Sequence, residues 1–301
     1  MGVKKINFVK DVASVLGCDC AEIRRQYPHL ETAKCRDVIS ASTLGELRCD
    51  GLALASLKMR RNFAPVGLQE FVIDEKNSHV PKIILILESP HKDEYRVRCY
   101  ECSKQNQCGL YSTPVPARGM TGISIKMKLP LLFNQRFDDY YVGFMNLIQY
   151  QCSLGVDISV DNKSKISIKD KIVWSLFDDD KFSYKDDFIS RLENAYNSEY
   201  DIIVVCSTGG RDKRNHICKI IETSLRDVRC LLSTGHPISW LQKQRNSNFE
   251  IKACRNMAEI ASNNSTIEDH SQLFAILSGE KCSRKGYIEF QSYERKPENG
   301  K

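Results

Sequence analysis

The sequence lacks any apolar run long enough to cross a membrane. A membrane-spanning helix needs about 18 consecutive apolar residues, and no apolar run here is longer than that at residues 83–87, which is the length of a β-strand. At the N-terminus, lysine and aspartate interrupt the apolar residues (MGVKKINFVKDVASV), unlike a secretory signal peptide. We therefore expect a cytoplasmic protein without membrane contacts.

Internal repeats are also missing, and the only polar low-complexity stretch is the tail at residues 294–301. The 13 cysteines are an odd number, and without a signal peptide they predict reduced thiols rather than disulfides. The formal net charge of +6 is mildly basic and is compatible with a nucleic-acid partner, since Lys and Arg make most phosphate contacts. The charge alone does not identify such a partner.

What the chain does have is an alternation of strand and helix patterns. Four apolar runs predict strands, at residues 83–87, 141–148, 202–206 and 228–232. Helical spacing of apolar residues precedes the third strand (188, 192, 195, 196) and the fourth (217, 220, 221), and a further helix is predicted around 253–261. The pattern predicts an α/β fold with a mostly parallel central sheet flanked by helices.

The same patterns divide the chain into three parts. Residues 1–80, with Val9, Val12, Val15 and Leu16 at helical spacing, are interpreted as an N-terminal helical accessory layer. Residues 81–262 are interpreted as the α/β core. Residues 263–301 form a C-terminal extension and polar tail.

Polar residues follow the predicted strands, where ligands of parallel α/β sheets bind. Glu88-Ser89-Pro90-His91 follows the first strand, Asn146 lies within the second, and His236-Pro237 follows the fourth. The Gly-rich turn after the third strand, residues 207–210, lacks the Gly-Lys-Ser/Thr of a P-loop. Each loop also has a structural interpretation: a Pro-containing turn, an exposed edge Asn, or a structural His.

Taken together, these loops resemble the uracil-DNA glycosylase superfamily over about residues 80–262. Its first motif reads Gly-Gln-Asp-Pro-Tyr-His or Gly-Glu-Ala-Pro-Gly, and residues 87–91 (LESPH) are similar to it. Its His-Pro-Ser-Pro motif is similar to residues 236–239 (HPIS), and its central Leu-Asn-Ala/Thr-Val to residues 145–148 (MNLI). A Gly-Leu-aromatic stretch at 109–111 and the segment 249–257 add to the resemblance. The resemblance also implies that the core carries an insertion at about 153–200, where the chain is longer than the family needs.

The resemblance implies a monofunctional, metal-independent DNA glycosylase. In this interpretation Glu88 orients water and stabilises the sugar cation, and His236 donates to the departing base. Asn146 reads the edge of a flipped pyrimidine, and Tyr111 stacks on it. His91 takes the place of the Tyr that blocks 5-substituents in the classical enzymes, and the base pocket also includes Ser89 and Pro90.

This replacement favours a modified, 5-substituted cytosine or uracil over plain uracil as the excised base. Attack on phage DNA that carries modified cytosines would be one biological setting. Uracil repair is the alternative, as is a catalytically silent DNA-binding protein with the same fold. A nucleoside N-glycosidase is a third possibility, which the basic residues around the site disfavour.

The resemblance also implies double- or single-stranded DNA as the partner of a monomer. The residues expected to contact DNA are Arg118, Arg211, Lys213, Ser239, Trp240, Lys243 and Arg245. Their alternative interpretation is a solvated basic rim, with Trp240 packed beneath its loop. Phosphate contacts would make binding depend on salt.

No cofactor and no metal are predicted. Cys99, Cys102 and Cys108 offer an alternative, because Cys-x-x-Cys is half of a typical zinc site. Some branches of the superfamily hold an iron–sulfur cluster, but Cys18-Asp19-Cys20 has the wrong spacing for it. Free thiols are the expectation.

Overall fold

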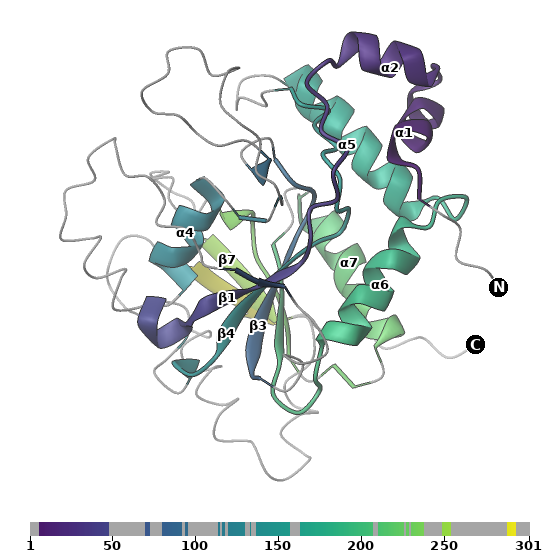
Figure 1. The fold of residues 1–301 in the computed structure, drawn as a ribbon. Coiled ribbons are helices and arrows are strands. Elements are labelled where there is room, and N and C mark those ends of the chain that lie inside the picture. The colour runs from purple at the N-terminus through teal and green to yellow at the C-terminus, as the bar shows by residue number, and fades with distance from the viewer. Residues whose placement is uncertain are drawn as a thin grey trace, which may run out of the picture.

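A mixed sheet with helices on both faces forms the centre of the structure, which is a computed structural model (Figure 1). It describes residues 6–47, 70–72, 80–91, 94–95, 114, 116–117, 120–129, 133, 137–156, 163–206, 210–225, 227–228, 230–237, 249–253 and 288–292. Over these residues the sheet has eight strands in the order β2-β1-β4-β3-β5-β6-β7-β8. In that order they are Glu70–Val72, Val38–Thr43, Tyr141–Asn146, Lys82–Leu87, Ile202–Val205, Leu231–Ser233, Phe249–Ala253 and Ile288–Ser292.

The four central strands, β4, β3, β5 and β6, are parallel. β1 is antiparallel to both β4 and β2, and β7 is antiparallel to β6 and parallel to β8. The sheet therefore confirms an α/β fold with mostly parallel strands. From β3 the chain continues to β4 on one side, and from β5 it continues to β6 on the other side. The topological switch point therefore lies between the carboxyl ends of β3 and β5.

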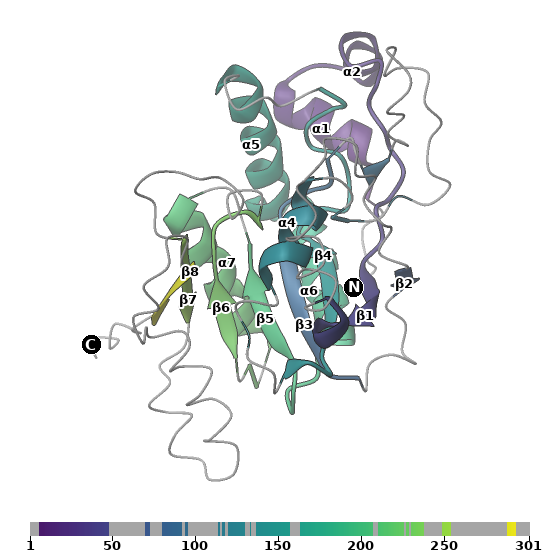
Figure 2. The ribbon, with the colours of Figure 1, turned by 90° about the vertical axis from the view of Figure 1, so that its left-hand side faces the viewer.

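Among the described residues, helices cover the two faces of the sheet unequally. The structure has α1 (Phe8–Leu16), α2 (Cys20–Gln26), α4 (Met120–Lys128), α5 (Lys163–Asp178), α6 (Tyr184–Ala195) and α7 (Gly210–Ser224). Helices α1, α5, α6 and α7 pack on one face, and α4 packs on the other. Figure 2 shows the strands side by side with α4 on the nearer face and α5 rising beyond one end of the sheet.

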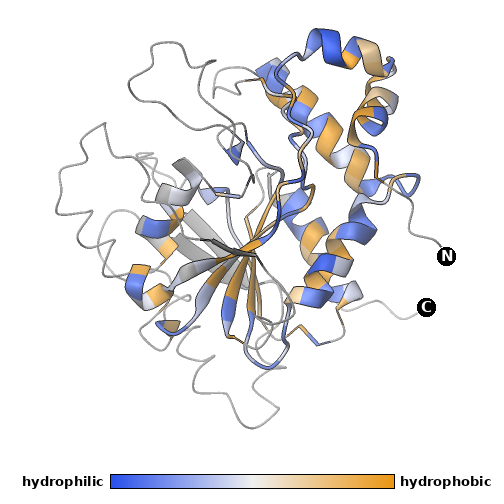
Figure 3. Ribbon diagram, viewed as in Figure 1, coloured by the Kyte–Doolittle hydropathy of each residue, from blue (hydrophilic) through white to orange (hydrophobic). Residues whose placement is uncertain are grey.

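Burial on both faces explains the continuous apolar run of β3. Ile84 and Ile86 pack against α5, α6 and α7, while Ile83, Leu85 and Leu87 pack on the α4 side. A strand buried on both sides has no reason to alternate with polar residues. Figure 3 accordingly shows apolar strands at the centre and helices in which apolar and hydrophilic residues are mixed.

The predicted helix at residues 9–16 is confirmed as α1. Asn7 caps it by accepting from the backbone N–H of Lys10 at 3.3 Å, and Gly17 ends it with φ of 72°, a conformation that glycine adopts without strain. The Tyr184 hydroxyl donates to Asp11 at 2.9 Å and so joins α6 to α1.

Three sequence predictions need correction. Residues 1–80 were expected to be helical, yet β1 and β2 lie within this range and extend the sheet. The predicted start of the helix around 253–261 is wrong, because Ala253 is the last residue of the strand β7. Residues 254–261 lie outside the described residues. The fourth strand starts at Leu231, three residues later than expected. In each case strand pairing set the element boundaries more strongly than the local pattern.

The segment interpreted as an insertion, about 153–200, contains α5 and α6. These two helices form the crossover between the parallel strands β4 and β5. A parallel connection needs such a crossover, so part of this segment belongs to the architecture of the sheet itself.

Candidate active site

The carboxyl ends of the parallel strands bring Glu88, Asn146 and His236 to one edge of the sheet. Asn146 is the last residue of β4 and is in register with Leu87, the residue before Glu88. Beyond the strands, the backbone N–H of Leu147 donates to the Leu87 carbonyl at 2.9 Å, and that of Ile148 to the Glu88 carbonyl at 3.1 Å. This edge includes the switch point between β3 and β5, where ligands of such sheets bind.

Glu88 is a buried carboxylate, with 2% of its surface exposed. Its Oε2 forms an ion pair with the Nζ of Lys169, whose side chain is 15% exposed and comes from α5. Burial alone would lower the pKa of Lys169. The charge of Glu88 and its hydrogen bond, together with smaller effects of Asp170 and Cys152, outweigh burial, and the pKa of Lys169 is raised. Lys169 is therefore a cation at neutral pH.

His236 is neutral at neutral pH. Burial, followed by the Lys169 ammonium and then by His91, lowers the pKa of His236 to about 4, while Glu88 opposes the shift. A neutral imidazole has one N–H donor and one acceptor nitrogen. The loop that carries it is fixed, because the Ser124 hydroxyl on α4 donates to the Pro237 carbonyl.

This lowered pKa predicts that the protein loses stability as the pH falls from about 6.5 to 4. In that interval the unfolded chain binds a proton at His236 and the folded protein does not, so unfolding becomes more favourable. Relative to His236→Asn, the wild type should lose on the order of 1–2 kcal/mol of unfolding free energy between pH 7 and pH 5. Urea denaturation at both pH values measures this difference. His29→Asn, at an exposed histidine, is the control, and equal pH dependence in wild type and His236→Asn would contradict the prediction.

Asn146 is buried, with 1% of its surface exposed. Its Nδ2 lies 3.9 Å from the Cys35 sulfur, and its Oδ1 has no hydrogen-bond partner among the described residues. A buried polar atom without a partner costs about 1–3 kcal/mol, and native proteins tolerate few of them without a ligand or a functional reason. This amide is consequently a candidate to bind a ligand.

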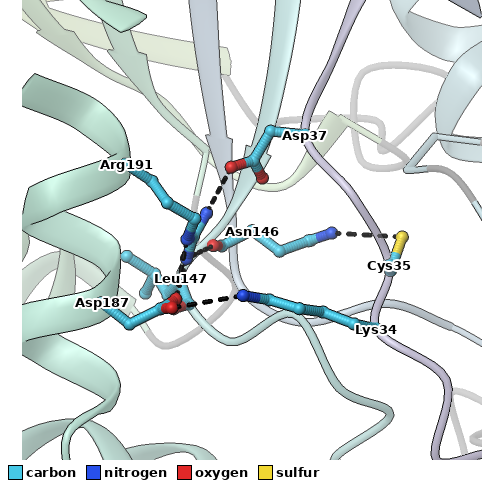
Figure 4. A network of polar contacts seen from close by, with 7 residues as sticks. All are labelled: Lys34, Cys35, Asp37, Asn146, Leu147, Asp187 and Arg191. Carbon is cyan, nitrogen blue, oxygen red and sulfur yellow. Dashed lines mark hydrogen bonds and ion pairs between the residues drawn. The ribbon is translucent and has the colours of Figure 1, made fainter. Parts of the chain in front are cut away.

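Arg191 on α6 holds the end of β4 in place (Figure 4). It donates through Nη2 to the backbone carbonyls of Asn146 at 2.9 Å and Leu147 at 3.3 Å. It also forms ion pairs with Asp37 at 2.6 Å and with Asp187 at 2.7 Å. The N-terminal segment that contains Cys35 and Asp37 thus forms one side of the site.

The loop after β3 is also anchored. The buried Glu94 carboxylate accepts from the backbone N–H of His91 and, at 2.9 Å, from that of Ala117. Pro90 is buried and Ser89 is half-buried in the same loop. This anchoring holds the backbone of His91, the residue at the predicted gate, three residues after Glu88 in the chain.

The residues predicted to contact DNA are only partly described. The Lys213 ammonium lies over the Trp174 ring at 4.3 Å and its charge acts on Asp170 of α5, while Arg211 lies in the first turn of α7. Outside the described residues lie Tyr111, Arg118, Ser239, Trp240, Lys243, Arg245 and the three cysteines Cys99, Cys102 and Cys108.

Sequence reasoning missed Lys169 and Arg191. Lys169 lies three and four residues before Ile172 and Val173, which are buried, so it falls on the apolar side of α5. A lysine on the apolar face of a helix is unusual unless it has a partner. That signal was available in the sequence, but it does not say which carboxylate the lysine meets.

Within the described part of the chain, no helix is long and apolar enough to span a membrane, and no cluster of three or more His, Cys, Asp or Glu residues could hold a metal ion. Comparisons with protein-family models, with curated proteins and with solved structures found no match to this chain.

Proposed function

We propose that this protein is a DNA glycosylase that hydrolyses the N-glycosidic bond of a flipped pyrimidine. The observation that carries the proposal is the pairing of a buried carboxylate, Glu88, with a neutral imidazole, His236, at the edge where the Asn146 amide also lies. The three groups have different chemistry, and each suits a different part of base excision.

Cleavage of the bond develops positive charge on the sugar and negative charge on the departing base. The Glu88 carboxylate would orient the attacking water and stabilise the sugar cation. His236 would donate its N–H to the pyrimidine O2, where negative charge develops. A neutral donor is sufficient for this role, and the lowered pKa of His236 keeps the imidazole neutral at physiological pH.

Asn146 suits recognition of a pyrimidine because it offers an acceptor and a donor side by side. Its Oδ1, which has no partner among the described residues, would accept from the base, and Nδ2 would donate to it. Rotation of the side-chain amide by about 180° exchanges its donor and acceptor, so Asn146 can pair with cytosine as readily as with uracil. Arg191 would keep this amide in position through its bond to the Asn146 carbonyl.

A 5-substituted pyrimidine is the substrate that we favour over plain uracil. His91 is smaller than the Tyr that excludes such substituents in the classical enzymes, and it can form a hydrogen bond. Nearby loops also contain buried polar atoms that have no partner in the described residues: Tyr95 OH, Gln151 Nε2 and Ser153 Oγ. Buried groups of this kind favour a polar substituent on the base over an apolar one.

Excision from a panel of DNAs tests this function. We expect release of 5-hydroxymethylated or glucosylated cytosine to exceed release of uracil and cytosine, with abasic sites revealed by alkali. His91→Tyr should suppress release of the substituted bases by about tenfold or more and leave any uracil release unchanged, because one misfit group costs about 1–3 kcal/mol.

His29→Tyr, at an exposed histidine, is the matched control and should behave as wild type. Release of uracil alone, unaffected by His91→Tyr, would point to uracil repair instead. If no DNA of the panel loses a base, the proposed activity is wrong.

A further inference from the structure

Lys169 forms an ion pair with the candidate catalytic carboxylate, and none of the sequence motifs includes it. It comes from the middle of α5, 81 residues away from Glu88 in the chain, and its Nζ forms an ion pair with the Glu88 Oε2. Both side chains are largely shielded from water, with exposures of 15% and 2%. Solvent therefore screens this pair much less than an ion pair on the surface.

An isolated carboxylate is costly to bury in its ionised form, and a neighbouring cation offsets that cost. Lys169 supplies such a cation through its ion pair with the Glu88 Oε2. Asp170 is an acid, Cys152 is a buried thiol whose pKa is raised chiefly by burial, and His236 is neutral. Lys213, on α7, acts on Asp170 and also lies over Trp174. Lys169 thus compensates the buried charge of Glu88.

We propose that Lys169 is a positioning residue that holds the Glu88 side chain in place and keeps it negatively charged within the site. This role rests on the proposed function of Glu88 in base release. Lys169 acts through Glu88, and it also affects His236. Its charge is the second-largest cause of the lowered pKa of His236, after burial. Lys169 therefore favours both an ionised Glu88 carboxylate and a neutral His236 imidazole, which are the protonation states that the proposed chemistry needs.

A pH profile distinguishes this role from a structural one. In Lys169→Met, protonation of Glu88 becomes easier, so the acid limb of single-turnover base release should move to higher pH. We expect a loss of about tenfold or more near pH 6 that recovers as the pH is raised to about 8.5. Lys169→Arg retains the positive charge, so the acid limb of its pH profile should stay at the wild-type pH. Lys171→Met removes an exposed lysine of the same helix and should change nothing.

A second readout does not depend on activity. The effect of Lys169 on the pKa of His236 exceeds the opposite effect of Glu88. Hence the pKa of His236, measured by NMR titration, should rise in Lys169→Met whether or not Glu88 remains ionised, and Lys169→Arg should leave it unchanged. Lys169→Gln serves the same purpose if the Met variant does not fold.

The outcomes separate this proposal from the proposed function. If wild type releases no base from any DNA, the function is wrong, and the NMR titration still tests Lys169. An unchanged acid limb together with an unchanged pKa of His236 in Lys169→Met would overturn the positioning role. Borohydride trapping of a covalent complex with DNA in wild type, lost in Lys169→Arg, would overturn it as well, because Lys169 would then be a nucleophile.

Discussion

Glu88→Gln and His236→Ala should each slow base release at least ~100-fold, the effect typical of losing a general base or a donor to the leaving group. Gln cannot accept a proton from water or stabilise a sugar cation by charge. Ala removes the N–H that would meet the departing base. Single-turnover release from the best DNA of the panel measures both losses, while DNA binding should survive both changes.

Glu193→Gln is the matched control for the carboxylate, since it changes an exposed glutamate of α6. Glu88→Gln leaves the Lys169 ammonium without its buried partner, so the unfolding free energy of each variant should be measured beside its activity. Full single-turnover activity in a folded Glu88→Gln or His236→Ala variant would remove that residue from the proposed mechanism.

The largest effect on stability should come from an ion pair at the opposite end of the sheet. The Lys82 Nζ and the Asp201 Oδ2 are 2.7 Å apart, and both side chains are fully buried. Asp201 also accepts from the backbone N–H of Lys82 at 3.0 Å and of Asn197 at 2.8 Å. Lys82→Met leaves this carboxylate buried without its cation and should lower the unfolding free energy by about 3–5 kcal/mol in denaturant titrations.

The pair Lys185–Asp180 provides the contrast, with the same 2.7 Å separation and side-chain exposures of 33% and 88%. Lys185→Met should cost less than about 1 kcal/mol, because water already screens that pair. In addition, Lys82→Met combined with Asp201→Asn should cost less than the sum of the two single changes, since neither charge is left alone. Equal costs for Lys82→Met and Lys185→Met would show that burial does not decide the strength of these pairs.

The sequence by itself determined the class of the fold and the position of three candidate residues. Strands β3 and β5 are recognisable in the sequence because both of their faces are buried, which leaves a continuous apolar run, rich in β-branched residues, in the chain. Once the strands are parallel, their carboxyl ends meet at one edge, so Glu88, Asn146 and His236 could be placed near each other from their order alone. These inferences need only local patterns and one topological rule.

Only the tertiary structure decided which partners these residues have. Lys169 reaches Glu88 across 81 residues of chain, and Cys35 reaches Asn146 across 111. Arg191 joins α6 to the end of β4 and to Asp37. The apolar pattern of a helix identifies its buried face but not the charged residue that this face contacts. A short strand with both polar and apolar residues, such as β1, is stabilised by pairing with its neighbours β2 and β4 rather than by its own residues. The protonation states of the site therefore depend on long-range contacts, because burial and neighbouring charges exist only in the folded chain.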